Sequence, residues 1–127
     1  MKIITHLAFA FVFTALLLSP IAASAQVKNI NLQKGKKTVL KGQVRKGGER
    51  LYTFEAEKGQ TLNVRLLSTQ KKAIFSVNLQ SREEYEIIED NRTEWSGILP
   101  ESESGIYSIA VKSNKGLQAF TLEITLK

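Results

Sequence analysis

The residues best suited to chemistry lie in one segment, LPESESGIYSIAV, which runs from Leu99 to Val111. Ser104 and Gly105 stand where turn residues give way to an alternating strand pattern, and Tyr107 lies on one face of that strand. A hydroxyl and a glycine at a loop tip indicate a binding function, because loops held by a rigid sheet carry the contact residues of many binding proteins. A simple turn is the competing interpretation, since serine hydrogen-bonds its own backbone and glycine adopts positive φ.

Tyr107 favours a structural role. A tyrosine at the start of a strand locks the corner of a β-sandwich when its hydroxyl bonds to backbone a few residues upstream. We therefore expect the Tyr107 side chain to belong to the core and to hold the preceding loop in place.

Beyond the N-terminal segment the sequence has neither histidine nor cysteine, so catalysis would have to use carboxylates, hydroxyls and lysines. The sequence has a single histidine, His6, and no cysteine. Once the segment that holds His6 is removed, Ser-His catalysis, Cys-His catalysis and ordinary zinc sites are excluded. A glycosidase would need paired carboxylates about 5–10 Å apart in a cleft, and a packed domain of this size offers little cleft. We therefore expect no enzymatic activity and no cofactor.

The N-terminus predicts export. Lys2 precedes an apolar run at residues 7–18, a Ser-Pro break and an A-S-A sequence at residues 23–25, which together are typical of a secretory signal peptide. The apolar run is too short for a permanent anchor, which needs about 20 residues, and the absence of cysteine excludes a lipid anchor. We predict a signal peptide at residues 1–25, one domain at residues 26–127, and a periplasmic location without a membrane anchor.

The formal net charge is +6 for the whole chain, and it becomes +5 when Lys2 is lost with the signal peptide. Basic side chains are scattered through predicted turns and are not interleaved with aromatic residues. This pattern indicates a solvated surface and no nucleic-acid partner. These side chains are Lys34, Lys36, Lys37, Lys41, Arg45, Lys46, Lys71 and Lys72.

Alternating apolar residues predict an all-β domain. The pattern occurs in eight short segments, at residues 27–32, 38–44, 51–57, 61–68, 73–80, 93–99, 105–112 and 119–126. Strands at a spacing of roughly 8–12 residues are typical of a sandwich or barrel, and no segment after residue 25 has a helical stripe. We predict a single antiparallel β-sandwich. Tight turns at Lys58-Gly59 and at residues 113–116 predict two hairpins, and Gly42 predicts a bulge.

The segment from Ser81 to Asp90 is acidic and lacks regular alternation. Three interpretations are open: a solvated loop, a calcium site, and a surface that steers a basic partner. The calcium interpretation has enough oxygen ligands but lacks the D-x-D-x-D-G spacing of an EF-hand loop. In the steering interpretation, carboxylates of this segment act together with two from the loop before the Tyr107 strand, if these lie nearby. They are Glu83, Glu84, Glu86, Glu101 and Glu103.

Three stretches resemble a known family. YTFEAEKGQTL at residues 52–62, LPESESGIYSIAV at residues 99–111 and the terminal FTLEITL are similar to the bacterial pre-peptidase C-terminal domain. The resemblance extends from Leu40 to the end of the chain, although residues 81–90 match no motif of the family. It implies a small jelly-roll-like β-sandwich of the kind appended to secreted peptidases.

A narrower resemblance comes from a signal peptide followed by one such domain that carries Ser104-Gly105-Ile106-Tyr107. This arrangement resembles the periplasmic inhibitors of goose-type lysozyme. Bacterial lysozyme inhibitors carry an S-G-x-Y or S-G-x-x-Y loop associated with the active-site cleft of the enzyme. The resemblance implies a polar contact for Ser104, close backbone passage at Gly105, a bracing or contact role for Tyr107, and a basic lysozyme as partner. The alternative is a module that binds a glycan or a partner protein, with or without calcium.

Overall fold

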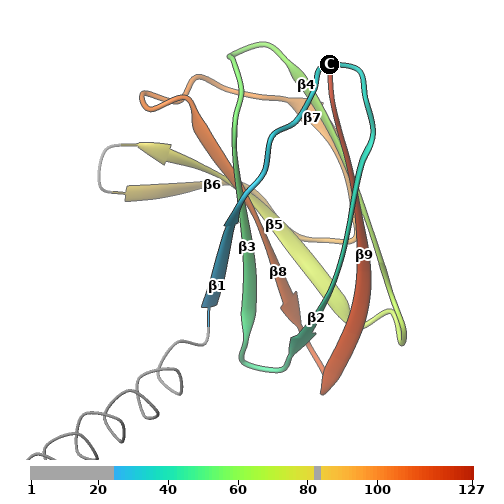
Figure 1. The fold of residues 1–127 in the computed structure, drawn as a ribbon. Coiled ribbons are helices and arrows are strands. Elements are labelled where there is room, and N and C mark those ends of the chain that lie inside the picture. The colour runs from blue at the N-terminus through green and yellow to red at the C-terminus, as the bar shows by residue number, and fades with distance from the viewer. Residues whose placement is uncertain (1–24, 82–83) are drawn as a thin grey trace, which may run out of the picture.

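The computed structural model describes residues 25–81 and 84–127, and within them the chain forms nine strands (Figure 1). They are β1 (Ala25–Asn29), β2 (Thr38–Arg45), β3 (Glu49–Glu55), β4 (Thr61–Ser68), β5 (Ala73–Ser81), β6 (Glu84–Arg92), β7 (Glu94–Ile98), β8 (Ile106–Ser113) and β9 (Leu117–Leu126). No helix in the described part of the chain is long and apolar enough to cross a membrane. The predicted signal peptide, apart from Ala25, lies outside the described residues, and so does Glu83.

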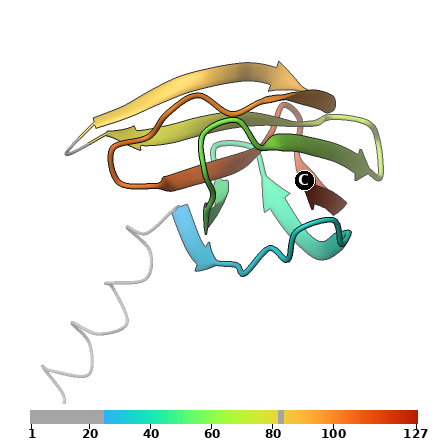
Figure 2. The same ribbon diagram turned by 90° about the horizontal axis from the view of Figure 1, so that it is seen from above.

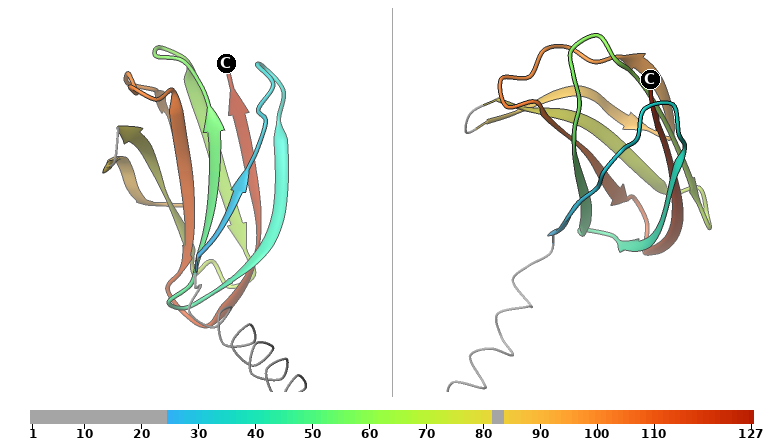
Figure 3. Two further views of the ribbon diagram at one scale, coloured as in Figure 1. Left: turned by 60° about the vertical axis from the view of Figure 1, so that its left-hand side comes forward. Right: turned by 45° about the horizontal axis from the view of Figure 1, so that its top comes forward.

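The strands form two sheets that pack face to face (Figure 2 and Figure 3). One sheet has the strand order β1-β3-β8-β5-β6, and the other has the order β2-β9-β4-β7. Neighbouring strands are antiparallel except for β1 and β3, which run parallel from the Ala25–Glu49 pair to the Asn29–Thr53 pair. The predicted all-β sandwich is therefore confirmed, with one parallel pair at an edge of the five-stranded sheet.

The core lies between the two sheets, where the alternation of each central strand places its apolar side chains. Ala56, whose alternation also predicts an inward position, follows the end of β3 and is partly buried against the core. The other predicted inward-facing side chains of five strands are buried: Tyr52 and Phe54 on β3, Leu62, Val64 and Leu66 on β4, Phe75, Val77 and Leu79 on β5, Tyr107, Ile109 and Val111 on β8, and Phe120, Leu122, Ile124 and Leu126 on β9. Each large apolar side chain contributes about 1.5–3 kcal/mol when buried. Because the chain has no cysteine, this core takes the place that disulfides fill in many small exported domains.

The two predicted hairpins are wrong. β3 pairs with β1 and β8, whereas β4 pairs with β9 and β7, so the turn at Lys58-Gly59 leads from one sheet to the other. The turn at residues 113–116 also changes sheets, because β8 and β9 lie in opposite layers. Strands that pair side by side and strands that face each other across a core have the same period-two alternation. A tight turn can join either kind.

Residues 84–90 of the acidic segment belong to a strand, which corrects the solvated-loop interpretation. β6 forms an edge of the five-stranded sheet beside β5, with register shifts between Phe75 and Asn78. Its side chains are mostly exposed, including Tyr85 and Ile87, and the paired ends of β5 and β6 project from the sandwich (Figure 1). Exposure on both faces removes the apolar alternation by which a strand is recognised. Charges on an edge strand also oppose pairing with other chains.

Gly42 does not mark a bulge. The register of β2 with β9 is unbroken from Thr38 to Arg45. A Cβ atom at Gly42 would lie 2.9 Å from Cζ of Phe120. The glycine therefore leaves room for a buried aromatic ring, which is the other common reason for glycine inside a strand.

Candidate functional site

The segment that the sequence singles out forms the connection between β7 and β8, residues 99–105, which we call the β7–β8 loop. It crosses from the four-stranded to the five-stranded sheet at the end of the sandwich where the β3–β4 connection also lies (Figure 3). Leu99 is buried, and its N–H donates to the carbonyl of Gln60 at 2.9 Å. The carbonyl of Gly105 accepts the N–H of Ala56 at 3.1 Å. The loop is therefore held at both ends by the β3–β4 connection.

Tyr107 anchors the same loop from the core. Its side chain is 1% exposed, and its ring stacks on Phe54 with the ring centroids 5.9 Å apart. The hydroxyl donates to the carbonyl of Pro100 at 2.5 Å, which confirms the predicted bond to upstream backbone. Burial raises the pKa of the Tyr107 hydroxyl above its ordinary value of 10.0, although a backbone hydrogen bond from Ser102 opposes the shift. Because the ring is enclosed in the core, Tyr107 holds the loop in place and cannot itself contact a binding partner.

The hydroxyl of Ser104 is exposed but already bonded within the protein. It donates to the carbonyl of Gln80 at 2.8 Å and accepts the N–H of Ile106 at 3.2 Å. The Ser102 hydroxyl donates to the same carbonyl, also at 2.8 Å. The pairing of β8 with β5 ends one residue before Gln80. The two serines therefore satisfy a β5 carbonyl that lies beyond the ladder.

Gly105 turns the chain into β8. Its φ of 73° lies in the left-handed region that favours glycine, and its N–H donates to the carbonyl of Ser102 at 3.1 Å. The turn chemistry expected at Ser104 and Gly105 is therefore present, and it coexists with an exposed tip. These internal bonds order the loop before any partner arrives, which lowers the conformational entropy that binding would cost.

Carboxylates surround the loop. Glu101 and Glu103 belong to it and are exposed. Glu84 and Glu86 are exposed on β6, and β5 lies between β6 and β8, a separation of about 10 Å at normal strand spacing. The structure thus brings Ser104 together with two of the predicted acidic residues and sets the two on β6 to one side.

A shallow depression of about 600 Å³ adjoins Ser104 and Gly105. Its other lining residues are Leu32, Lys34, Glu55, Ala56, Glu57, Gln60 and Leu126. Glu55 and Glu57 are absent from the predicted site. Their outward positions on the predicted strand at residues 51–57 are a weak signal, because alternation alone does not reveal that the β3–β4 connection meets the β7–β8 loop.

No group of three or more His, Cys, Asp or Glu side chains in residues 25–81 and 84–127 could hold a metal ion. The calcium interpretation therefore gains no support from the structure. We use the term loop end for residues 55–60, 84–86 and 99–105, where hydroxyls, backbone groups and carboxylates are exposed together. Such groups can accept and donate hydrogen bonds and attract a cationic surface, so the loop end is suited to binding.

Solved structures share this fold. PliG of Aeromonas hydrophila, a periplasmic lysozyme inhibitor of g-type lysozyme, has a TM-score of 0.62 and 25% identity over 81% of this chain and 99% of that chain. Salmonella Typhimurium PliG has a TM-score of 0.54 and 19% identity, with 79% and 99% coverage. The pre-peptidase C-terminal domain of Bacillus anthracis collagenase has a TM-score of 0.53 and 17% identity, with 81% and 96% coverage. No family model and no curated protein sequence matches the chain. The two resemblances drawn from sequence are therefore confirmed in fold.

Tyr107→Phe tests the anchor, because it removes the hydroxyl bound to Pro100 and retains the ring stacked on Phe54. We expect the free energy of unfolding to fall by about 1 kcal/mol, which corresponds to about 4–8 °C in melting temperature for a domain of this size. Thermal melts followed by circular dichroism measure the change. Tyr85→Phe is the matched control, since the Tyr85 side chain is 56% exposed, and it should leave the melting temperature unchanged.

The same pair of proteins should differ at high pH. Because burial raises the folded-state pKa of Tyr107, its contribution to stability is complete below the ordinary value and is lost as the pH rises through the folded-state pKa. Wild type should therefore lose more stability than Tyr107→Phe as the pH rises above the ordinary tyrosine pKa of 10.0. Tyr52, whose pKa is also raised by burial, is present in both proteins and cancels. Equal slopes together with equal melting temperatures would contradict the anchoring role.

Proposed function

We propose that this protein is exported to the periplasm and inhibits a g-type (goose-type) lysozyme by placing its β7–β8 loop in the enzyme's cleft. The observation that carries the proposal is the exposed loop tip held by two bonds, from Tyr107 to Pro100 and from Ser104 to Gln80. The fold shared with the PliG inhibitors supports it, because the likeness covers almost the whole of those chains. In this proposal the protein is a binding protein and not an enzyme.

The loop offers groups that match a sugar-binding cleft. A lysozyme cleft contains a catalytic carboxylic acid and polar groups that hydrogen-bond sugar. The Ser104 hydrogen is donated to Gln80, and a hydroxyl has one donor and two acceptor sites. Ser104 therefore meets the enzyme as an acceptor, beside exposed backbone of the loop tip. A protonated catalytic acid is a suitable donor to such a group.

Rigidity of the loop contributes to affinity. Ordering a flexible side chain at an interface costs about 0.5–1.5 kcal/mol. The loop is already fixed before association by hydrogen bonds within it, to Gln80 and from Tyr107. The acidic groups of the loop end favour encounter with lysozymes, which are generally basic proteins. Charges outside the contact act mainly on the association rate.

The central experiment is inhibition of g-type, chicken-type and invertebrate-type lysozymes by wild type and Ser104→Ala. We expect wild type to inhibit the g-type enzyme most strongly. Ser104→Ala should weaken this inhibition roughly 5- to 150-fold, because the loss of an acceptor leaves its donor on the enzyme unpaired and costs about 1–3 kcal/mol. Enzyme assays across a range of inhibitor concentrations give the inhibition constants.

Ser113→Ala is a matched control at the opposite end of the sandwich. The Ser113 hydroxyl also donates to a backbone carbonyl, that of Gly116 at 2.8 Å, and accepts a backbone N–H, that of Lys115 at 3.2 Å. Its loss should affect stability at least as much as Ser104→Ala and should leave inhibition unchanged. If wild type inhibits none of the three enzymes, the inhibitor proposal fails and a non-inhibitory binding module takes its place.

A second prediction concerns the carboxylates of β6. Glu84→Gln combined with Glu86→Gln should slow association with a basic lysozyme by about two- to ten-fold at low salt and leave dissociation nearly unchanged. Surface plasmon resonance separates the two rates. The effect should fade as salt rises, since the screening length is already about 10 Å at 0.1 M.

Glu94→Gln combined with Glu123→Gln removes the same charge from the four-stranded sheet, where both residues lie. This control should slow association less than the β6 variant does. Equal effects of the two variants would show that only net charge matters and would reject steering by β6.

A further inference from the structure

The end of the sandwich opposite the loop end is strongly basic. Three turns meet there: the β2–β3 turn, the β4–β5 turn and the β8–β9 turn. We use the term basic end for these turns and the adjoining strand residues, at positions 45–50, 69–72 and 112–117. This set contains seven cationic side chains and one carboxylate. The cations are Arg45, Lys46, Arg50, Lys71, Lys72, Lys112 and Lys115, and the carboxylate is Glu49.

Backbone hydrogen bonds hold the three turns together. The N–H of Lys46 donates to the carbonyl of Gly116, and the N–H of Asn114 donates to the carbonyl of Lys72, both at 2.8 Å. The cationic residues therefore sit on turns whose positions are fixed relative to one another. Segments distant in the sequence thus form one continuous surface.

A buried glutamine joins two of these turns through its side chain. Gln118 is fully buried, and its Oε1 accepts the N–H of Gln70 at 3.1 Å. Its Nε2 donates to the carbonyl of Lys115 at 3.0 Å. Because these bonds join the β4–β5 turn to the β8–β9 turn, the basic end is a preorganised platform and not a set of independent loops.

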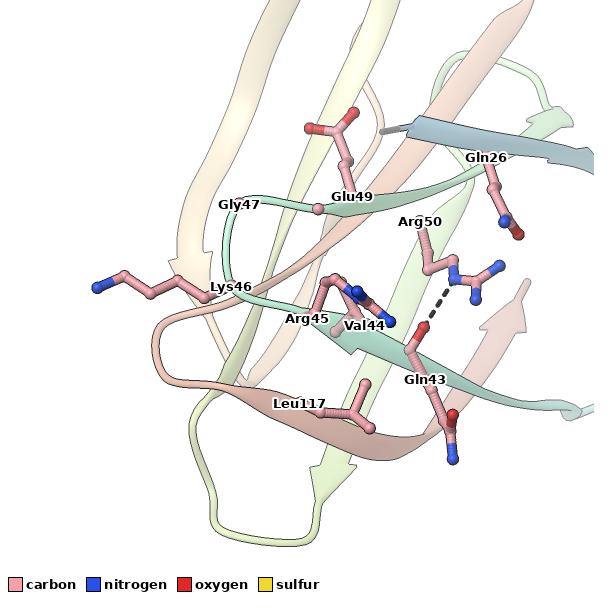
Figure 4. A pocket seen from close by; sticks show the side chains of 10 residues that line it. Gln26, Gln43, Val44, Arg45, Lys46, Gly47, Glu49, Arg50 and Leu117 are labelled. Atoms are coloured by element: carbon pink, nitrogen blue, oxygen red, sulfur yellow. Dashed lines mark hydrogen bonds between the residues drawn. The ribbon is translucent and has the colours of Figure 1, made fainter. Parts of the chain in front are cut away.

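Two guanidinium groups face the same hollow on this platform. A depression of about 450 Å³ lies between the β2–β3 turn and the start of β9, and Arg45, Arg50 and Leu117 line it. Figure 4 shows both arginine side chains extending over this depression while Lys46 points away from it. The Nε of Arg50 donates to the carbonyl of Gln43 at 2.7 Å, which orients the guanidinium. Guanidinium groups suit phosphate because their donors form a planar fork.

Acidic groups do little to neutralise the platform. The Oε2 of Glu49 lies 3.6 Å from the Nζ of Lys112, so the one carboxylate is already matched to one of the seven cations. The acidic strand β6 reaches this end at Asn91, which lines a second depression with Gly47 and Lys112. Excess positive charge therefore faces solvent at one end of the molecule, while the loop end carries six carboxylates.

We propose that the basic end docks the protein on an anionic phospholipid surface through the phosphate groups of the lipid heads. Leu117 favours this partner over a nucleic acid, because it is 56% exposed among the cations and apolar side chains flanked by cations suit the headgroup boundary. No aromatic side chain is exposed within the basic end, whereas single-stranded nucleic acid is bound by stacking on aromatic rings. Docking of this kind is peripheral and needs no membrane-spanning segment.

Docking through the basic end would fix the orientation of the protein on the lipid surface. The β2–β3, β4–β5 and β8–β9 turns lie at one end of the sandwich and the β7–β8 loop lies toward the other (Figure 1). A protein held by its basic end would present the loop end away from the lipid. The docking inference does not depend on the identity of the partner that binds the loop.

Binding to vesicles tests the proposal. Residues 26–127, which contain the whole described core, are mixed with vesicles of equal parts phosphatidylglycerol and phosphatidylcholine, and the bound fraction is measured by sedimentation. Each cation near an anionic surface raises the partition coefficient by about five-fold. Lys46→Gln, Lys71→Gln, Lys72→Gln and Lys115→Gln combined should therefore lower binding at least about a hundred-fold.

The matched control removes four lysines elsewhere, by combining Lys34→Gln, Lys36→Gln, Lys58→Gln and Lys127→Gln. It has the same net charge as the basic-end variant and should lose less than about ten-fold, because its lysines lie near the loop end. Equal loss in the two variants would overturn the proposal, as would failure of wild type to bind the anionic vesicles.

Two further measurements distinguish lipid phosphate from inorganic phosphate and from the phosphates of a nucleic acid. Inorganic phosphate should not displace the protein from vesicles beyond the effect of chloride at equal ionic strength, because one phosphate cannot engage the whole platform. Displacement by phosphate alone would reassign the basic end to a small-anion site and overturn the proposal. Tighter binding to duplex DNA than to vesicles at equal phosphate concentration would overturn it in favour of a nucleic acid.

Discussion

The burial of the Tyr107 ring is the constraint on which the loop end depends. The ring stacks on Phe54 inside the core, and its hydroxyl holds the carbonyl of Pro100 in a connection that pairs with no strand. Without this bond the loop would be held by its two ends and by the serine contacts with Gln80. Packing of the core and the shape of an exposed surface are therefore coupled through one side chain. The same burial that stabilises β8 keeps Ser104 in position.

Strands that bury one face can be predicted from this sequence, and their partners cannot. β9 alternates apolar and polar residues from Phe120 to Leu126, and β8 has large apolar side chains at alternate positions from Tyr107 to Val111. The inward faces of both strands are therefore predicted correctly. β6 escapes prediction because both of its faces meet solvent. The sheet-crossing turns at Lys58-Gly59 and at residues 113–116 look like hairpin turns. Whether two consecutive strands pair in one sheet or face each other across the core depends on how the two sheets pack over the whole domain. Local sequence patterns do not contain this information.

In the candidate site, too, local features can be predicted from the sequence and long-range contacts cannot. The loop, its glycine and its bracing tyrosine are predictable because turn chemistry and strand alternation are local. The internal bond of Ser104 is not, because its acceptor on Gln80 lies 24 residues earlier in the chain. A net charge of +6 also does not reveal that cations gather at one end of the sandwich and carboxylates at the other. Cations scattered over three turns become one basic end only when the turns meet, and Glu55 and Glu57 join the loop end by the same route.

Amide hydrogen exchange of the protein, free and mixed with a g-type lysozyme, tests the central claim that the loop held by Tyr107 is the recognition surface. We expect added protection at the amides of residues 101–106 and at the neighbouring amides of residues 56–60, with no change at residues 112–117. We also expect Tyr107→Phe to exchange faster at residues 101–106 in the free protein. Protection confined to other residues, or no complex at micromolar concentrations, would show that this loop is not the recognition surface.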